Sequence, residues 1–194
     1  MESTRSGRIE VKLVESMDEM TKVLAVRAAV CLGELQWPFH EYMDGNDFTA
    51  TQLIATVDGE PAGTMRIRYF GDFAKPEWLV VLERFRRGRF GARGVAYALG
   101  SHAFAFCRKK GFTRIYGHAA SDLEALWRKI AGDGVRRMAD SVATGECKGA
   151  IVPLIADYEP ASGACGLSSL AHQEGHLLFT RPEAKLDREL SEVA

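Results

Sequence analysis

Hydrophobic and polar residues alternate over several short stretches of the chain, which is typical of β-strands with one buried face. Asp58 and Gly59 join two of these stretches and indicate a hairpin. The consecutive apolar residues 79–82 favour a strand that is covered on both faces. The pattern predicts strands at residues 9–14, 53–57, 64–70, 77–85, 113–118, 135–138 and 149–156.

Apolar residues recur at helical spacing between some of these strands. A capping-box pattern at 16–19 predicts a helix that ends near Cys31. The strongest helical pattern covers 92–110, where apolar side chains share one face and basic residues precede a glycine at the end. Another helix is expected at 121–130. A hairpin followed by alternating strands and helices implies an α/β fold, a mixed β-sheet with helices on its faces.

The expected strands end near residue 157, which divides the chain into two parts. Residues 1–157 are expected to form one domain, and 158–194 a C-terminal extension. A short helix is expected from about Pro182, with apolar residues along one side. The extension is therefore expected to pack on the domain or on a partner.

Composition and charge exclude several classes of protein. Lys and Arg number 25 and Asp and Glu 26, a formal net charge of −1, which disfavours a general nucleic-acid-binding protein. No apolar run approaches the roughly 18 residues of a membrane span. The polar N-terminus lacks the pattern of a secretory signal. The four cysteines form no CxxC pair, as expected for reduced thiols of a cytoplasmic protein, and no metal site is expected.

One segment, LERFRRGRFGARG at 82–94, carries the most informative chemistry. A buried strand is expected to lead through a loop of Arg and Gly into the strongest helix. Backbone N–H groups at a helix start and arginine side chains both bind phosphate oxygens, so the segment predicts a phosphate or pyrophosphate cradle. An RNA-binding patch, with Phe85 and Phe90 between the arginines, and a solvated charged surface are the alternatives.

The pattern Arg89-x-x-Ala92-x-Gly94 resembles the Arg/Gln-x-x-Gly-x-Gly/Ala loop of the GCN5-related N-acetyltransferase superfamily. In that superfamily the loop holds the pyrophosphate of coenzyme A. The resemblance implies a splayed sheet, acetyl-CoA or acyl-CoA as acyl donor, and a small-molecule amine as acceptor. Ala92 replaces the usual glycine, and Trp127 lies near the position of the usual tyrosine general acid. The resemblance implies as the cofactor loop Arg89, Phe90, Gly91, Ala92, Arg93 and Gly94. Arg84 and Phe85, which also belong to the synthase-like pattern described next, are predicted to bind the cofactor as well.

A second set of residues is similar to the pattern of acyl-homoserine-lactone synthases and N-acyl amino acid synthases, which share the same fold. The resemblance implies an acyl chain longer than acetyl and adds acyl carrier protein as a possible donor carrier. The sequence also leaves open that two copies of the chain form a homodimer. The implied substrate-binding residues are Arg27, Trp37, Asp44, Asp47 and Arg66.

Two residues are candidates for catalysis. Glu83 is expected near the end of a central strand, where a partly buried carboxylate is suited to remove a proton from an ammonium group. The alternative for Glu83 is a structural role, in which it forms an ion pair with Arg84 or Arg66. His118 ends the fifth strand and is either a proton-handling residue or a packed histidine.

Two aspartates allow two interpretations. Asp44 and Asp47 either cap the turn at 44–46 or hold Arg27 and Arg66 in an ion-pair network beside the acceptor.

The sequence as a whole predicts acyl transfer from a pantetheine thioester to a primary amine by direct attack. The alternatives are an N-acyl amino acid or acyl-homoserine-lactone synthase, and a non-catalytic acyl-CoA-binding sensor.

Overall fold

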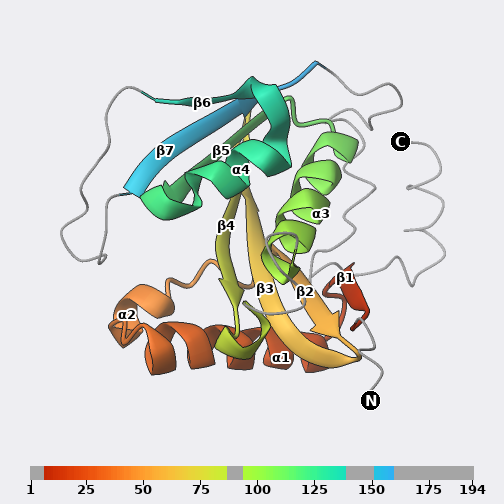
Figure 1. The fold of residues 1–194 in the computed structure, drawn as a ribbon, viewed down its shortest axis with the longest axis vertical. Coiled ribbons are helices and arrows are strands. Elements are labelled where there is room, and N and C mark those ends of the chain that lie inside the picture. The colour runs from red at the N-terminus through yellow and green to blue at the C-terminus, as the bar shows by residue number, and fades with distance from the viewer. Residues whose placement is uncertain (1–6, 87–93, 139–150, 160–194) are drawn as a thin grey trace, which may run out of the picture.

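One mixed sheet organises the protein, as the sequence predicted. The computed structural model describes residues 7–86, 94–138 and 151–159. Its sheet has the strand order β1-β2-β3-β4-β5-β7-β6 (Figure 1). Neighbouring strands are antiparallel except β4 and β5, which are parallel. The strands are β1 (Ile9–Leu13), β2 (Thr51–Val57), β3 (Glu60–Tyr69), β4 (Ala74–Val81), β5 (Arg114–Ala120), β6 (Val135–Arg137) and β7 (Ile151–Asp157).

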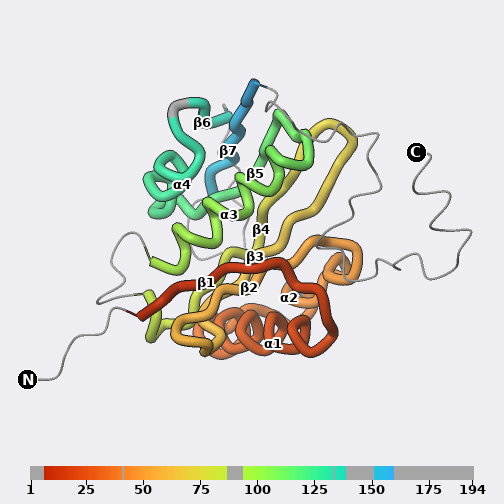
Figure 2. The backbone as a smooth tube through the Cα atoms, turned by 90° about the vertical axis from the view of Figure 1, so that its right-hand side faces the viewer, coloured from red at the N-terminus to blue at the C-terminus, as the bar shows by residue number. Residues whose placement is uncertain are grey.

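Helices cover both faces of the sheet. α1 packs on β2, β3 and β4, while α3 packs on the opposite face of β1–β4 and also contacts α4. Figure 2 shows α1 below these strands and α3 above them. The helices are α1 (Met17–Ala28), α2 (Phe39–Tyr42), α3 (Val95–Lys109) and α4 (Glu124–Ala131).

The main core lies between α3 and the sheet. Met65 and Ile67 of β3 and Leu99 of α3 are fully buried there. A Cβ atom at Gly63 would lie 2.8 Å from the Val80 carbonyl oxygen and 3.0 Å from Val95, so glycine lets α3 approach the sheet closely at this point.

The sheet opens between β4 and β5. Their register holds a single pair, Ala74 with Ile115, after which the two strands diverge (Figure 1). The half with β5, β6, β7 and α4 therefore separates from the half with β1–β4 and α1. This divergence agrees with the splayed sheet that the resemblance implied.

The structure corrects several expected boundaries. β4 begins at Ala74 and ends at Val81, so the expected strand 77–85 was shifted, and Glu83–Phe85 forms a 3₁₀ turn instead. The expected loop at 33–46 contains α2, and a π-helical turn over Ala29–Glu34 extends α1. These changes matter because Val30 of the π-helical turn and Tyr42 of α2 pack with Val80 of β4 in one buried cluster.

The C-terminal extension is described only at its first two residues. Tyr158 packs on the domain, where its hydroxyl donates to the Ala131 carbonyl at 3.0 Å and Arg108 lies over its ring. The helix expected from about Pro182 lies outside the described residues.

Candidate active site

A β-bulge in β4 marks the centre of the candidate site. Arg66 pairs with Glu77 and Thr64 with Val80, so Trp78 and Leu79 both lie opposite one residue of β3. Trp78 has φ of 55°, which is uncommon for a bulky residue and indicates a locally enforced conformation. A bulge residue has no partner in the strand ladder, so its backbone is open to another partner.

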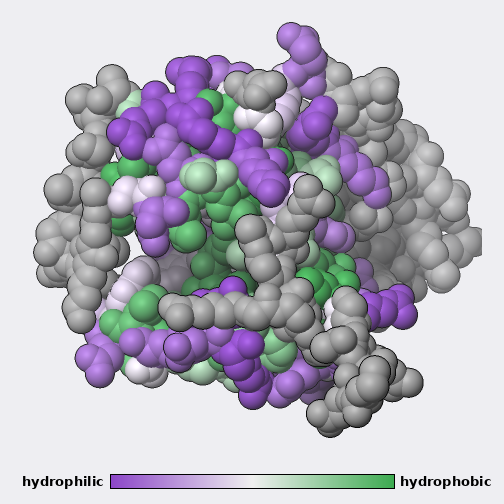
Figure 3. Space-filling view, in the orientation of Figure 1, coloured by the Kyte–Doolittle hydropathy of each residue, from purple (hydrophilic) through white to green (hydrophobic). Residues whose placement is uncertain are grey.

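A large cavity opens on the α3 side of this bulge. It has a volume of about 560 Å³ and lies among the end of β4, the start of α3 and the helix α4. Figure 3 shows hydrophobic residues in the hollow between the two halves of the molecule. The cavity is lined by Leu79, Val81, Phe85, Arg86, Gly94, Val95, Ala96, Tyr97, Leu123, Ala125, Leu126 and Lys129.

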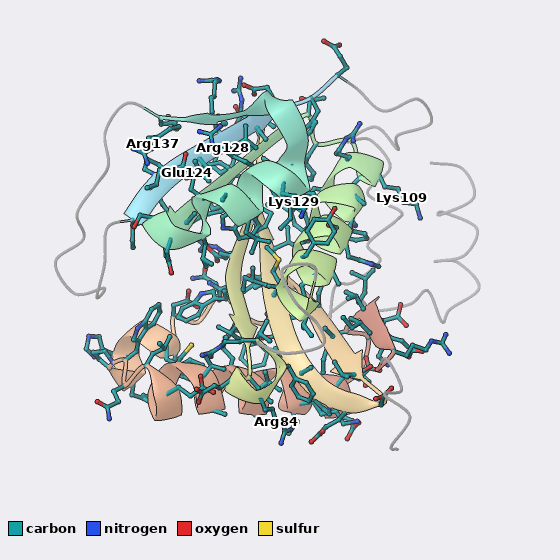
Figure 4. All side chains as sticks on the ribbon, in the orientation of Figure 1. Arg84, Lys109, Glu124, Arg128, Lys129 and Arg137 are labelled. Atoms are coloured by element: carbon teal, nitrogen blue, oxygen red, sulfur yellow. The ribbon has the colours of Figure 1, made fainter. Side chains whose placement is uncertain are left out.

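The charged groups of this lining are cations. Arg86 donates to the Val81 carbonyl at 2.6 Å and pairs with Glu34. Lys129 lies on α4, on the other side of the cavity (Figure 4). The lining therefore combines apolar walls with positive charge at its border, which suits a ligand with an apolar arm and an anionic end.

The start of α3 borders the same cavity. Gly94 is the N-cap of α3, and no side chain caps the helix there. The first backbone N–H groups of a helix and its dipole favour an anion at this end. Of the other predicted cofactor residues, Phe85 is buried and lines the cavity, while Arg84 pairs with Glu60 at 2.5 Å. Residues 89–93 lie outside the described residues.

The α1 side of the bulge carries a buried ion-pair network. Arg27 and Arg66 are each 1% exposed. Arg66 binds Asp44 at 2.6 Å and Asp47 at 3.0 Å, and Arg27 pairs with the other oxygen of Asp47. The ion pairs expected between the two aspartates and the two arginines are therefore present, and Asp44 also caps the turn by accepting from the Asn46 backbone at 3.0 Å.

Arginine neighbours shift the acidity of both aspartates in the same direction. The Arg66 guanidinium holds the pKa of Asp44 well below its usual range. Burial opposes ionisation of Asp47, but hydrogen bonding and charge from Arg27 and Arg66 outweigh it and lower the pKa of that carboxyl. Both side chains are therefore anions at neutral pH.

Glu77 is a third carboxylate of this network, which the sequence analysis missed. Its side chain contacts Arg66 at 2.5 Å, Arg68 at 2.8 Å and Lys75 at 3.0 Å. The signal was present in the register, because Arg66 faces Glu77 and Arg68 faces Lys75 across β3 and β4. Because Arg66, Arg68 and Lys75 all contact this one carboxylate, positive charge exceeds negative charge at this end of the network.

Aromatic side chains separate this network from solvent. Trp37 contacts Trp78 edge to face at 5.5 Å, and Tyr42 contacts Trp78 in the same manner at 6.3 Å. The Arg27 guanidinium lies 5.1 Å from the Trp78 ring centre and 5.2 Å from that of Tyr42, within cation–π range. Trp37, a predicted substrate-binding residue, thus lies beside the bulge rather than apart from it.

The second predicted catalytic residue, His118, lies on β5 across the opening. Its Nε2 atom is 2.8 Å from the Tyr116 hydroxyl. His118 is exposed, but partial desolvation lowers its pKa and the Lys75 cation lowers it further, while Glu77 acts in the opposite direction. The imidazole is therefore predominantly neutral at neutral pH.

Glu83 does not have the environment that the sequence predicted. It lies on the exposed 3₁₀ turn after β4, not in the strand, and its backbone N–H donates to Glu34 at 3.3 Å. The expected ion pairs with Arg84 and Arg66 are replaced, since those arginines pair with Glu60 and with the Asp44–Asp47–Glu77 set. The predicted partial burial of the Glu83 carboxylate was therefore wrong.

The described residues set two further limits. They contain no group of three or more His, Cys, Asp or Glu residues that could hold a metal ion. Within the same ranges, no helix has the length and apolar character needed to cross a bilayer.

Comparisons with known proteins identify the fold. No family model matches the chain, and no curated protein matches it significantly in sequence. Among solved structures, it is similar to ElaA of Escherichia coli, with 19% identity, a TM-score of 0.64, and coverage of 77% of this chain and 100% of that one. FeeM, an N-acyl amino acid synthase from uncultured soil microbes, has 7% identity and a TM-score of 0.61, covering 78% and 91%.

A third structure was determined with coenzyme A bound. It is the PaiA N-acetyltransferase of Thermoplasma acidophilum, with 12% identity, a TM-score of 0.52, and coverage of 78% of this chain and 99% of that one. At these identities the likeness shows the fold. The protein has the fold of the GCN5-related N-acetyltransferases, and the fold that the resemblance implied is confirmed.

Proposed function

We propose that the protein transfers an acyl group from a pantetheine thioester to a primary amine. The observation that carries this proposal is the bulge at Trp78, which lies between an apolar cavity on the α3 side and a charged network on the α1 side. One side suits a thioester arm with a phosphate end, and the other suits a charged acceptor. The two reactants then meet at the bulge from opposite faces of the sheet.

The cavity fits the pantetheine arm of coenzyme A or of an acyl carrier protein. Its walls at Leu79, Val81 and Phe85 are apolar, and Lys129 and the start of α3 at Gly94 supply charge and N–H donors for phosphate. The predicted Arg89–Gly94 loop leads into the same helix start. Acetyl-CoA or acyl-CoA is thus the proposed donor, and the cytoplasm is the proposed location.

The reaction at the bulge is a direct transfer. Backbone N–H groups at the bulge stabilise negative charge on the thioester oxygen as the amine nitrogen attacks the carbonyl carbon. The C–S bond then breaks, its electron pair leaves on sulfur as the thiolate, and the nitrogen loses its remaining extra proton. The chain's own residues orient the reactants and handle protons, and no covalent acyl-enzyme is needed.

A second, smaller cavity suggests where an acyl chain longer than acetyl lies. It has a volume of about 30 Å³ and apolar walls that include Pro76, Gly117, Phe104 and Trp127. Pro76 of β4 lines the small cavity, and Leu79, a residue of the bulge, lines the large one about 10 Å further along the strand. A chain that continues past the thioester therefore reaches the small cavity, whose size favours a few carbon atoms.

The α1 side favours an acceptor that carries a carboxylate, as an amino acid does. Arg68 and Lys75 share the single Glu77 carboxylate with Arg66, so they retain capacity for a second anion. An α-amino acid bound there by its carboxylate would extend its amine toward the bulge. This observation supports the N-acyl amino acid synthase alternative over a simple amine acetyltransferase.

Thioester turnover tests the function directly. Free thiol is measured with acetyl to dodecanoyl thioesters, as CoA and as carrier-protein forms, against matched acceptors such as L-leucine and 3-methylbutylamine. We expect amide formation, with short acyl chains above acetyl preferred, and a preference for the amino acid that Arg68→Gln reduces about tenfold through a higher KM. Binding without turnover across the panel would support the sensor alternative instead.

A matched pair of variants tests the donor site. Gly94→Glu places a carboxylate at the start of α3, whereas Gly71→Glu adds the same charge in the turn between β3 and β4, where a Cβ meets no atom within 4 Å. Titration calorimetry should show weaker CoA binding only for Gly94→Glu. Equal affinity in both variants would reject the cradle.

A further inference from the structure

The β5 edge of the opening holds two polar side chains that project on the same face. Tyr116 and His118 alternate with Ile115 and Ala119, which are buried in the cores on the α3 and α4 side. Gly117 between them lies beside Pro76, whose carbonyl oxygen would be 3.5 Å from a Cβ added there. The next residue along β5 is therefore level with Glu77, one residue before the bulge.

The two side chains form a fixed pair. The Tyr116 hydroxyl and the His118 Nε2 atom are 2.8 Å apart, and their rings meet edge to face at 5.1 Å. Phe73 contacts the Tyr116 ring edge to face at 5.9 Å and so supports it from the other side. With Nε2 engaged, Nδ1 is the ring nitrogen that can act on a ligand.

The charged groups around the pair come from β4. Lys75 and Glu77 face the imidazole, while the residue opposite on β7 is Pro153, which has no titratable group. Among the described residues, the same Glu77 carboxylate is shared with Arg66 and Arg68, so its negative charge is largely balanced. This arrangement keeps the neutral imidazole available.

We propose that His118 is the base that deprotonates the acceptor ammonium group and that Tyr116 is the positioning residue that holds it. The inference rests on the proposed function and deepens it by assigning the proton transfer. In the tautomer with its proton on Nε2, His118 donates to the Tyr116 oxygen and presents the Nδ1 lone pair. An N–H bond of the ammonium breaks, Nδ1 takes the proton, and the electron pair stays on nitrogen for attack on the thioester carbon.

Tyr116 contributes before and after this transfer. The imidazolium carries protons on both nitrogens, and its Nε2–H continues to donate to the Tyr116 oxygen, which stabilises the charged form. His118 returns to the neutral form by releasing one proton to solvent, while the thiolate leaves with the C–S electron pair. Glu83 lies instead on the 3₁₀ turn beyond the end of β4, four residues after Leu79 of the bulge, whereas His118 is level with the residue just before the bulge.

The test is the pH dependence of amide formation by the full chain, with saturating donor, for the wild type and three variants. The wild-type rate should rise with pH to a plateau through an inflection below the usual histidine pKa. His118→Gln should lower kcat about a hundredfold or more at neutral pH and remove the inflection. Its loss should shrink at high pH, where the amine loses its proton unaided.

The other two variants separate positioning from folding. Tyr116→Phe should lower kcat and move the inflection to lower pH, because the imidazolium loses its acceptor. His102→Gln makes the same substitution on α3 as a matched control and should keep the wild-type profile. Circular dichroism on each variant checks that the fold is retained.

Each outcome bears on one claim. A wild type without amide formation over the whole panel contradicts the proposed function. A wild type that forms amide, with a His118→Gln profile that has the same rate and inflection, overturns the assignment of His118. An unchanged inflection in Tyr116→Phe overturns the positioning role.

Discussion

The two sides of the β4 bulge are built from different interactions. On the α3 side, an apolar cavity of about 560 Å³ is shaped by backbone and hydrocarbon, with Arg86 and Lys129 at its border. On the α1 side, Arg27 and Arg66 are buried and held by carboxylates. Shape therefore defines the proposed donor side, whereas charge defines the proposed acceptor side.

This difference predicts different sensitivities. A buried charge that loses its partner is strongly destabilising, because the remaining charge has no compensation in a low-dielectric surrounding. An apolar cavity adapts to many substitutions, and one that changes the charge at its border alters binding more than folding. Substitutions on the α1 side should therefore change stability and function together, and substitutions on the α3 side should change them separately.

Acidification should give the largest effect, because it neutralises Asp44 and Asp47 together. Both pKa values are lower in the folded protein than in the unfolded chain. The stabilisation is therefore present above the unfolded value, near pH 4, and is lost as pH falls through the folded values. Urea unfolding as a function of pH should show a steep fall below about pH 4; a flat profile down to pH 2 would contradict the network's role.

Asp47→Asn removes one carboxylate of the same network. It leaves Arg27 and part of Arg66 without a counter-charge, so the free energy of unfolding should fall by about 3–5 kcal/mol. The control is Asp18→Asn, which breaks the exposed Asp18–Lys22 pair of α1 and should change stability little. Equal urea midpoints for the two variants would show that the buried ion pairs of Asp47 stabilise the protein no more than the exposed Asp18–Lys22 pair does.

Gly63→Ala tests the packing of the α3 side. Its Cβ would meet the Val80 carbonyl oxygen at 2.8 Å, so the sheet or α3 has to shift, with an expected cost of about 1–3 kcal/mol. Gly71→Ala adds the same atom where nothing lies within 4 Å and should be nearly neutral. A thermal melt that ranks the two variants equally would contradict the close contact.

Lys129→Glu should give the smallest of these effects and act on binding alone. Reversal of this charge at the cavity border should weaken CoA binding about tenfold, or about 1.4 kcal/mol, without a change in unfolding. Lys22→Glu makes the same reversal on α1, away from the cavity lining. Calorimetry that finds equal losses for both variants would mean that only net charge matters.

The sequence predicted the order of strands and helices because periodicity and the hairpin signal at Asp58 and Gly59 are local. It also predicted that Asp44 and Asp47 bind Arg27 and Arg66, which the structure confirms. The resemblance that implied the fold was based on the Arg89–Gly94 pattern, which was expected between a buried strand and the strongest helix.

Other features depend on long-range contacts and could not be predicted. Trp78 adopts a left-handed backbone conformation although it is not a glycine, and Pro76 two residues earlier indicates an irregular strand without predicting this conformation. The start of β4 at Ala74 was missed because Lys75 is polar and Pro76 follows it, whereas in the structure Lys75 pairs with Glu77 and both residues lie in the ladder with β3. Glu83 was misplaced for the same reason, since the register with β3 ends β4 at Val81.

The most direct test of the central claim is a crystal structure of the protein with a non-hydrolysable acyl-CoA analogue and a candidate amino acid. We expect the pantetheine arm in the cavity lined by Leu79 and Val81, the carbonyl at the Trp78 bulge, and the amino acid on the α1 side near Arg68. A pantetheine arm on the α1 side, or a carbonyl away from the bulge, would contradict the account.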